Sequence, residues 1–100
     1  MFSGGDYHEV ARWLENFVGS HAKREDPRAE PVLDTEGPRE GVSYGVRVRF
    51  GERRSSEMDL AYADVAARRG SLAWNQELAE RVRGLAREAI GAEHSVSRPA

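Results

Sequence analysis

The sequence contains no cysteine, and it has no long apolar run. Without cysteine the chain can form neither disulfides nor thiolate-based catalytic and metal sites. No stretch approaches the ~20 apolar residues that span a bilayer. Residues 1–6 also lack the basic and apolar segments of a signal peptide. These absences predict a cytoplasmic protein with no membrane partner.

A large excess of charge of one sign is also lacking. Lysine and arginine number 15, aspartate and glutamate 17, and the net charge is -2. No overall field therefore attracts nucleic acid or an anionic membrane. Lys23 is the only lysine, and this arginine bias, together with abundant alanine, is typical of a GC-rich bacterial genome. The length of 100 residues indicates one domain with one small core.

The clearest pattern is the alternation of apolar and polar residues over 42–50. The even positions carry large apolar residues, and the odd positions carry serine, glycine or arginine. This period of two predicts a β-strand with one buried face. The same period returns over 57–62, so the two segments predict an antiparallel hairpin.

The register of this hairpin is restricted, because a one-residue slip would turn every apolar side chain of one strand outward. Two alternatives keep the apolar faces together. A five-residue connection sets Arg47 opposite Asp59 and Arg49 opposite Glu57, and a three-residue connection sets Arg47 opposite Glu57. We expect the first, because it forms two cross-strand ion pairs instead of one.

Apolar residues at three- and four-residue steps predict one long helix at each end of the chain. Asp6 begins a capping box for the first helix, and Pro27 follows its end. Ser71 can cap the second helix, and Gly91 is expected to stop it. Residues 31–35 form a weaker candidate strand before the hairpin, and residues 64–70 are expected to form a helical turn.

Two helices with one apolar stripe each, and a sheet with one apolar face, can all be buried if both helices pack on the same face. The sequence therefore predicts an α+β two-layer sandwich of order α-β-β-β-α, with a three-stranded antiparallel sheet. The domain should span residues 1–91, followed by a disordered tail over 92–100. The predicted core residues are Tyr7, Val10, Leu14, Phe17, Leu33, Tyr44, Val46, Val48, Met58, Leu60, Leu78, Val82 and Leu85.

The sequence carries no catalytic or metal-binding motif. His8, His21 and His94 are scattered along the chain, and without cysteine they do not give the spacing of a zinc site. Neither a nucleophile elbow nor a phosphate-binding loop is present. The adjacent acids Glu25 and Asp26 lie in a polar run without the apolar surroundings of a catalytic acid. We predict a protein that is not an enzyme and has neither cofactor nor metal.

Two pairs of adjacent arginines form local basic clusters: Arg53 with Arg54, and Arg68 with Arg69. Over roughly residues 6–90, the order of elements resembles that of the double-stranded RNA-binding domain. This resemblance of topology implies phosphate contacts from loops and from the start of the last helix. Residues 71–77, at that position here, carry one acid and no cation, so the main contribution to affinity is missing. Nucleic-acid binding through the four arginines is therefore the alternative function.

Two other features indicate protein contacts. Trp13 and Trp74 lie off the centre or near the end of their apolar stripes, so each either plugs an end of the core or reaches a partner. The second feature is the outward face of the sheet, where a flat, uncharged corner is expected beside two arginines. Its residues are Ser43, Gly45, Ala61, Arg47 and Arg49. The leading prediction is a small protein-interaction module that forms a homodimer.

Overall fold

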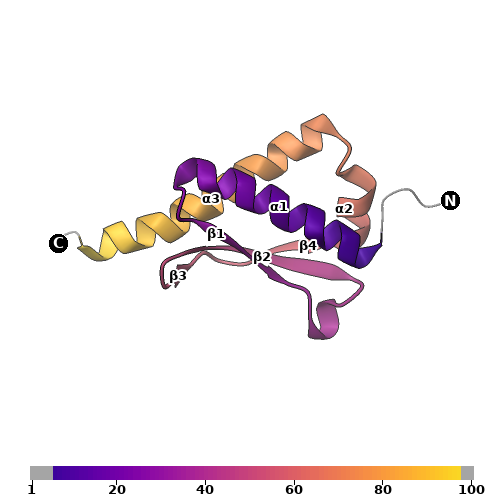
Figure 1. Ribbon diagram of the computed structural model, residues 1–100, viewed down its shortest axis with the longest axis horizontal. Coiled ribbons are helices and arrows are strands. Elements are labelled where there is room, and N and C mark those ends of the chain that lie inside the picture. The colour runs from indigo at the N-terminus through magenta and orange to yellow at the C-terminus, as the bar shows by residue number, and fades with distance from the viewer. Residues whose placement is uncertain (1–5, 98–100) are drawn as a thin grey trace.

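The computed structural model describes the backbone of residues 6–97 and the side chains of residues 6–91. Two long helices cover one face of an antiparallel sheet, and no described α-helix covers the other face (Figure 1). The predicted α+β fold class is thereby confirmed. The elements in chain order are α1 (Tyr7–Glu25), β1 (Glu30–Asp34), the 3-10 helix η1 (Gly37–Arg39), β2 (Ser43–Phe50), β3 (Arg53–Arg54), β4 (Met58–Ala61), α2 (Tyr62–Arg68) and α3 (Leu72–Ser97).

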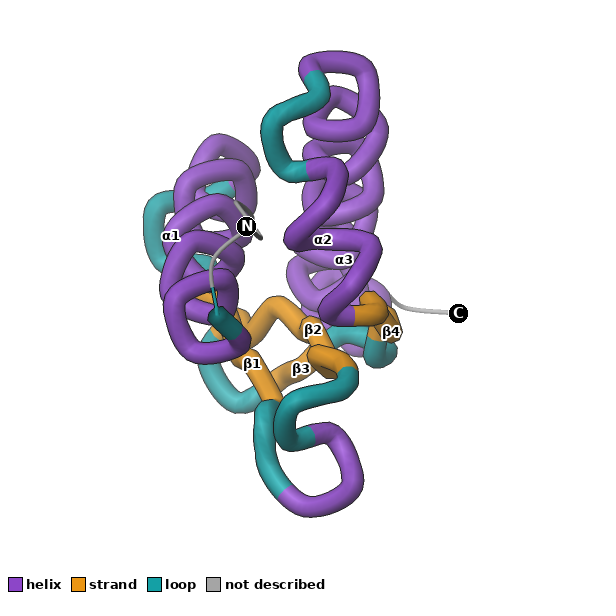
Figure 2. The backbone as a smooth tube through the Cα atoms, turned by 90° about the vertical axis from the view of Figure 1, so that its right-hand side faces the viewer, coloured by secondary structure: helices purple, strands orange, loops and turns teal. Residues whose placement is uncertain are grey.

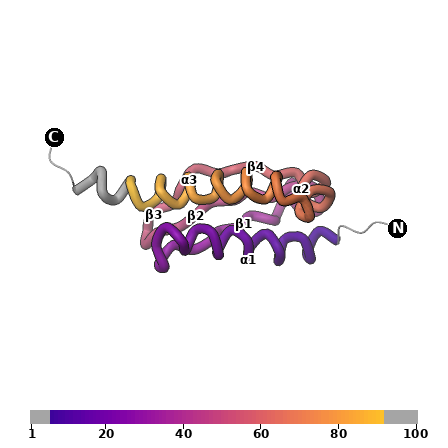
Figure 3. Tube along the Cα trace, turned by 90° about the horizontal axis from the view of Figure 1, so that it is seen from above, coloured from indigo at the N-terminus to yellow at the C-terminus, as the bar shows by residue number. Residues whose placement is uncertain are grey.

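Helices α1 and α3 lie side by side and run in the same direction (Figure 3). Figure 2 shows both of them above the strands, with the loop that contains η1 below. Helix α1 begins as predicted, because the Asp6 carboxylate accepts a hydrogen bond of 2.8 Å from the Glu9 backbone N–H. Gly19 does not end the helix. A Cβ there would lie 3.3 Å from Pro31 Cγ, so glycine allows α1 to approach β1 closely.

Strand β2 is the centre of the sheet. Strand β1 pairs with one of its edges and sets Leu33 opposite Val46, so the predicted inward position of Leu33 is confirmed. Strands β3 and β4 follow one another along the other edge of β2, so the sheet has three rows of strands.

The preferred register of the hairpin is wrong. Strand β4 sets Gly45 opposite Asp59 and Val46 opposite Met58, which is the register of the three-residue alternative. The tip is tighter still, because Phe50 pairs with Arg53 across two residues only. Gly51, the first of them, has φ of 64°, as in the two-residue turns that match the twist of a hairpin. The geometry of this turn therefore outweighs a second surface ion pair.

A β-bulge reconciles the tight turn with the apolar pattern. The pairing in β3 differs by one residue from the pairing in β4, and the extra residue lies between the two strands. Ser55 begins this segment. Its backbone N–H donates to the Val48 carbonyl at 2.9 Å, and its hydroxyl oxygen accepts from the Val48 N–H at 3.0 Å. The bulge returns Met58 and Leu60 to the helix side of the sheet.

Every predicted core residue is buried or packs against the core, although Phe17, Leu33 and Leu85 are only partly buried. Helix α2 adds residues that the sequence analysis did not include, because Val65 and Ala66 are both buried. One hydrophobic cluster thus joins the three helices to the sheet.

Helix α3 continues past Gly91 to Ser97, so the predicted stop at Gly91 is wrong. A glycine inside a helix costs only about 1 kcal/mol relative to alanine, which does not force an end. The side chains of residues 92–97 and all of residues 98–100 lie outside the described part of the chain. The disorder of the tail over 92–100 therefore stays a prediction. Among the described residues, no helix is both long enough and apolar enough to cross a bilayer.

Candidate functional site

The sheet face turned away from the helices, called the outer face below, is the candidate site. Side chains alternate along a strand, so the buried even-numbered residues of β2 leave the odd-numbered ones on the outer face. The register places Asp34 and Asp59 on either side of Gly45. It also places Glu30 and Arg54 on either side of Arg49. Carboxylates thus gather around one end of β2, whereas arginines predominate at the other.

Arg39, from η1, folds back over the carboxylate end of the outer face. Its Nη2 donates to Glu57 Oε1 at 2.9 Å and also contacts the Asp59 carboxylate. Its Nε lies 3.5 Å from Asp34 Oδ2, and its Nη1 donates to Ser43 Oγ at 3.1 Å. Hydrogen bonding to Asp59 raises the pKa of the Arg39 guanidinium further above its ordinary value. We call Arg39 with its three carboxylate partners the arginine clamp.

The side chains of the arginine clamp pack directly against Gly45. A Cβ at this position would lie 2.8 Å from Glu57 Cδ and 2.9 Å from Arg39 Nε, so any larger residue would displace both side chains. The expectation of a flat, uncharged corner is therefore wrong. Ser43 is hydrogen-bonded to Arg39, and only Ala61 is an exposed uncharged residue there. Whether this corner takes part in an interaction stays a prediction.

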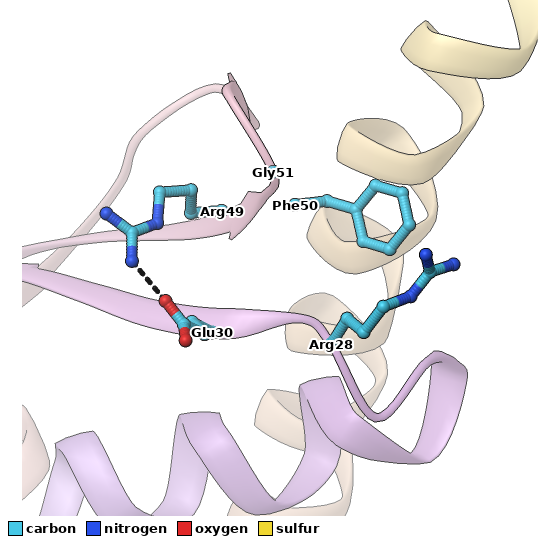
Figure 4. A pocket seen from close by; sticks show the side chains of 5 residues that line it. All are labelled: Arg28, Glu30, Arg49, Phe50 and Gly51. Carbon is cyan, nitrogen blue, oxygen red and sulfur yellow. Dashed lines mark hydrogen bonds and ion pairs between the residues drawn. The ribbon is translucent and has the colours of Figure 1, made fainter.

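At the other end of the outer face, Arg49 and Arg54 lie opposite each other on neighbouring strands. Arg49 pairs with Glu30 on β1 (Figure 4), and Arg47 Nε lies 3.8 Å from Glu57 Oε2. Arg54 is exposed and forms no ion pair with any described carboxylate. Like charges directly opposite each other repel, so this pair favours the approach of an external anion.

A shallow hollow of about 370 Å³ lies beside Arg49. Arg28, Glu30, Arg49, Phe50 and Gly51 line it, as Figure 4 shows. The Arg28 guanidinium lies 4.9 Å from the centre of the Phe50 ring, a cation–π contact. The hollow combines two guanidinium groups with one carboxylate and one aromatic ring, but it offers little apolar depth for a small molecule.

Both tryptophans are used in packing. Trp13 stacks on Phe17 with ring centres 5.0 Å apart, and the Arg69 guanidinium lies 5.9 Å from its ring. Trp74 is also partly buried and packs against the core. These positions favour, for both tryptophans, the alternative in which the side chain packs at an end of the core over the alternative in which it contacts a partner. The interaction role predicted for them has no separate support in the fold.

The four arginines of the nucleic-acid alternative are not brought together. Strand β3 and helix α2 lie at opposite ends of the molecule (Figures 1 and 3), and so do the arginine pairs that they carry. Arg53 is opposite Phe50, on the helix side of the sheet, whereas Arg54 belongs to the outer face. Arg68 is exposed, and Arg69 lies on Trp13.

The histidines and acids do not form a metal centre in the part of the chain that the structure describes. His21 stands in a partly buried position, where burial and the neighbouring Arg24 and Arg83 lower its pKa. This shift favours the neutral imidazole. His8 is exposed on the first turn of α1.

The residue of the candidate site that sequence reasoning missed is Arg39. It lies in a turn-rich segment, and nothing in that segment shows which way the loop folds. Gly45 was the one indication in the sequence that a side chain packs at this place, because an isolated glycine inside a strand often marks a point where another group approaches the backbone.

Comparisons with family models, with curated proteins and with solved structures find no significant match to this chain. The resemblance to the double-stranded RNA-binding domain therefore rests on the order of elements alone. Function has to be argued from the geometry of the outer face.

Proposed function

We propose that this chain is a small protein-interaction module that forms a homodimer through the outer face of its sheet. The observation that carries the proposal is the segregation of charge along β2. Asp34, Glu57 and Asp59 surround one end, and Arg49 and Arg54, with Glu30 paired to Arg49, occupy the other. A two-fold axis through the middle of this face sets the acidic end of each copy against the basic end of its partner.

The edges of the sheet support the face as the contact surface. Strand β1 carries Pro31, which has no backbone N–H to donate to an added strand. Strand β4 has only four residues and follows the bulge. Short, interrupted edges of this kind limit edge-to-edge pairing, so two copies meet more readily through their faces.

The proposed contact is electrostatic and therefore sensitive to salt. Exposed ion pairs contribute about 0.2 to 1 kcal/mol each, and salt screens charges over about 10 Å at 0.1 M. We expect a dimer at low salt whose dissociation constant rises as salt is added. Sedimentation velocity over a concentration series, at low and at high salt, measures this directly. A strict monomer at low salt and high protein concentration would contradict the homodimer.

The substitution Arg54→Glu tests which surface forms the contact. It places a carboxylate against the acidic end of the second copy at two symmetry-related positions. We therefore expect the dimer to weaken roughly tenfold or more. The matched control is Arg81→Glu, which makes the same charge change at an exposed position on α3. Equal effects of the two substitutions on the dissociation constant would rule out the outer face.

The same proteins distinguish the nucleic-acid alternative. A domain that binds duplex RNA through its arginines would bind at low salt and lose affinity steeply as salt rises. It would also be weakened by Arg68→Glu, a change on helix α2 and not on a strand of the sheet. Such a result, without a dimer, would replace the present proposal.

A further inference from the structure

We infer that Arg39 competes with the second copy for the carboxylates of the outer face, so that the arginine clamp limits the strength of the dimer. This inference rests on the proposed homodimer and concerns its regulation. The clamp binds the same carboxylates that the partner's arginines are expected to meet. Arg39 thus acts as an internal substitute for the partner.

The exposure of the clamp residues permits this competition. The Asp59 side chain is 75% exposed and the Asp34 side chain 51%, although both contact Arg39. The Arg39 side chain is only 19% exposed. The carboxylates are therefore open to a second cation from solution, while Arg39 lies against the sheet and offsets part of their charge.

The loop that carries Arg39 is held independently of the clamp. Gly37 and Gly41 have φ of 64° and 78°, so the chain turns on either side of Arg39 in conformations that favour glycine. The Tyr7 hydroxyl donates to the Ser43 carbonyl at 2.5 Å and lies 3.4 Å from the Thr35 carbonyl, at the two ends of the loop. Loss of the Arg39 charge therefore leaves the base of the loop in place.

The sign of the expected effect separates this role from a structural one. With Arg39 in place, the acidic end holds three carboxylates, and Arg47 also lies 3.8 Å from one of them, Glu57; all three contact the Arg39 guanidinium. Without that guanidinium, the same carboxylates attract the partner's arginines more strongly, and the repulsion between Arg39 and those arginines is removed. Removing a purely structural ion-pair partner would weaken the dimer or leave it unchanged.

The test is the dissociation constant of Arg39→Gln, measured by sedimentation velocity at low salt beside its unfolding midpoint. We expect binding roughly three- to tenfold tighter than in the native protein, because two symmetry-related sites each gain the strength of an exposed ion pair. Arg39→Lys keeps the charge and should remain within about twofold of the native value.

A second variant makes the test independent of Arg39 itself. Gly45→Ala introduces a Cβ that displaces the Arg39 and Glu57 side chains, so it should strengthen the dimer in the same direction. If Arg39→Gln did not fold, Gly45→Ala would decide the question. Combining Arg39→Gln with Arg54→Glu should abolish the gain, because Arg54 is the group expected to use the freed carboxylates.

The outcomes separate the two proposals. A salt-sensitive native dimer whose affinity is unchanged or weaker in both Arg39→Gln and Gly45→Ala would overturn the role of Arg39 and leave the homodimer standing. A native chain and an Arg39→Gln variant that are both monomeric at low salt would overturn both.

Discussion

Replacing Leu14 by alanine is expected to lower the free energy of unfolding by about 2 to 5 kcal/mol. Leu14 has no exposed surface and belongs to the cluster that joins α1, the sheet and α3. Its truncation removes buried apolar surface and leaves a cavity, because a packed interior relaxes only in part. Urea denaturation followed by circular dichroism measures the loss.

The matched control for this truncation is Leu72→Ala. Leu72 lies in the first turn of α3, and 73% of its surface is exposed. The same chemical change should there alter the free energy of unfolding by less than about 0.5 kcal/mol. Similar losses in both variants would mean that α1 does not pack on the sheet as described.

Ser55→Ala is expected to cost about 1 to 3 kcal/mol, although it removes a single oxygen atom. The Ser55 side chain is buried, and its hydroxyl accepts the hydrogen bond of the Val48 backbone N–H at the bulge. Alanine leaves that buried N–H without its partner, and the cost of removing the N–H from water is then uncompensated. The loss should appear as a lower urea midpoint with an unchanged slope.

Ser20→Ala is the control for this change. Ser20 is exposed on α1, where alanine is the better helix former, so stability should stay the same or rise by a few tenths of a kcal/mol. A Ser55→Ala protein as stable as Ser20→Ala would show that the bulge finds another acceptor for the Val48 N–H.

Much of the fold could be predicted because its patterns repeat over many residues. The alternation in β2 predicted that strand, and the apolar stripe and the cap at Asp6 predicted α1. The apolar stripes of both helices and the apolar face of the sheet can all be buried if both helices pack on one face of the sheet. The inward position of Leu33 followed from the same requirement. Patterns of this kind depend on burial, which the order of apolar residues records directly.

The hairpin register and the clamp depended on single local contacts instead. The turn at Gly51 and the hydroxyl of Ser55 decided the pairing of the strands, and each outweighed a surface ion pair. Arg39 reached the outer face through the course of a loop, which composition does not specify. At Gly91 the sequence predicted a helix end, but α3 continues, because a residue that favours helix ends does not force one.

The bulge at residues 55–57 also governs which length changes the hairpin can absorb. The pairing register of the tip differs by one residue from that of β4, and the extra residue of the bulge takes up this difference. Loss of one residue from the bulge, with the tip unchanged, would extend the pairing of the tip into β4 and keep Met58 opposite Val46, on the helix side of the sheet. Loss of two would set Met58 opposite Arg47 and turn Met58 and Leu60 outward. A deletion of one residue at this position should therefore be tolerated, whereas a deletion of two should not.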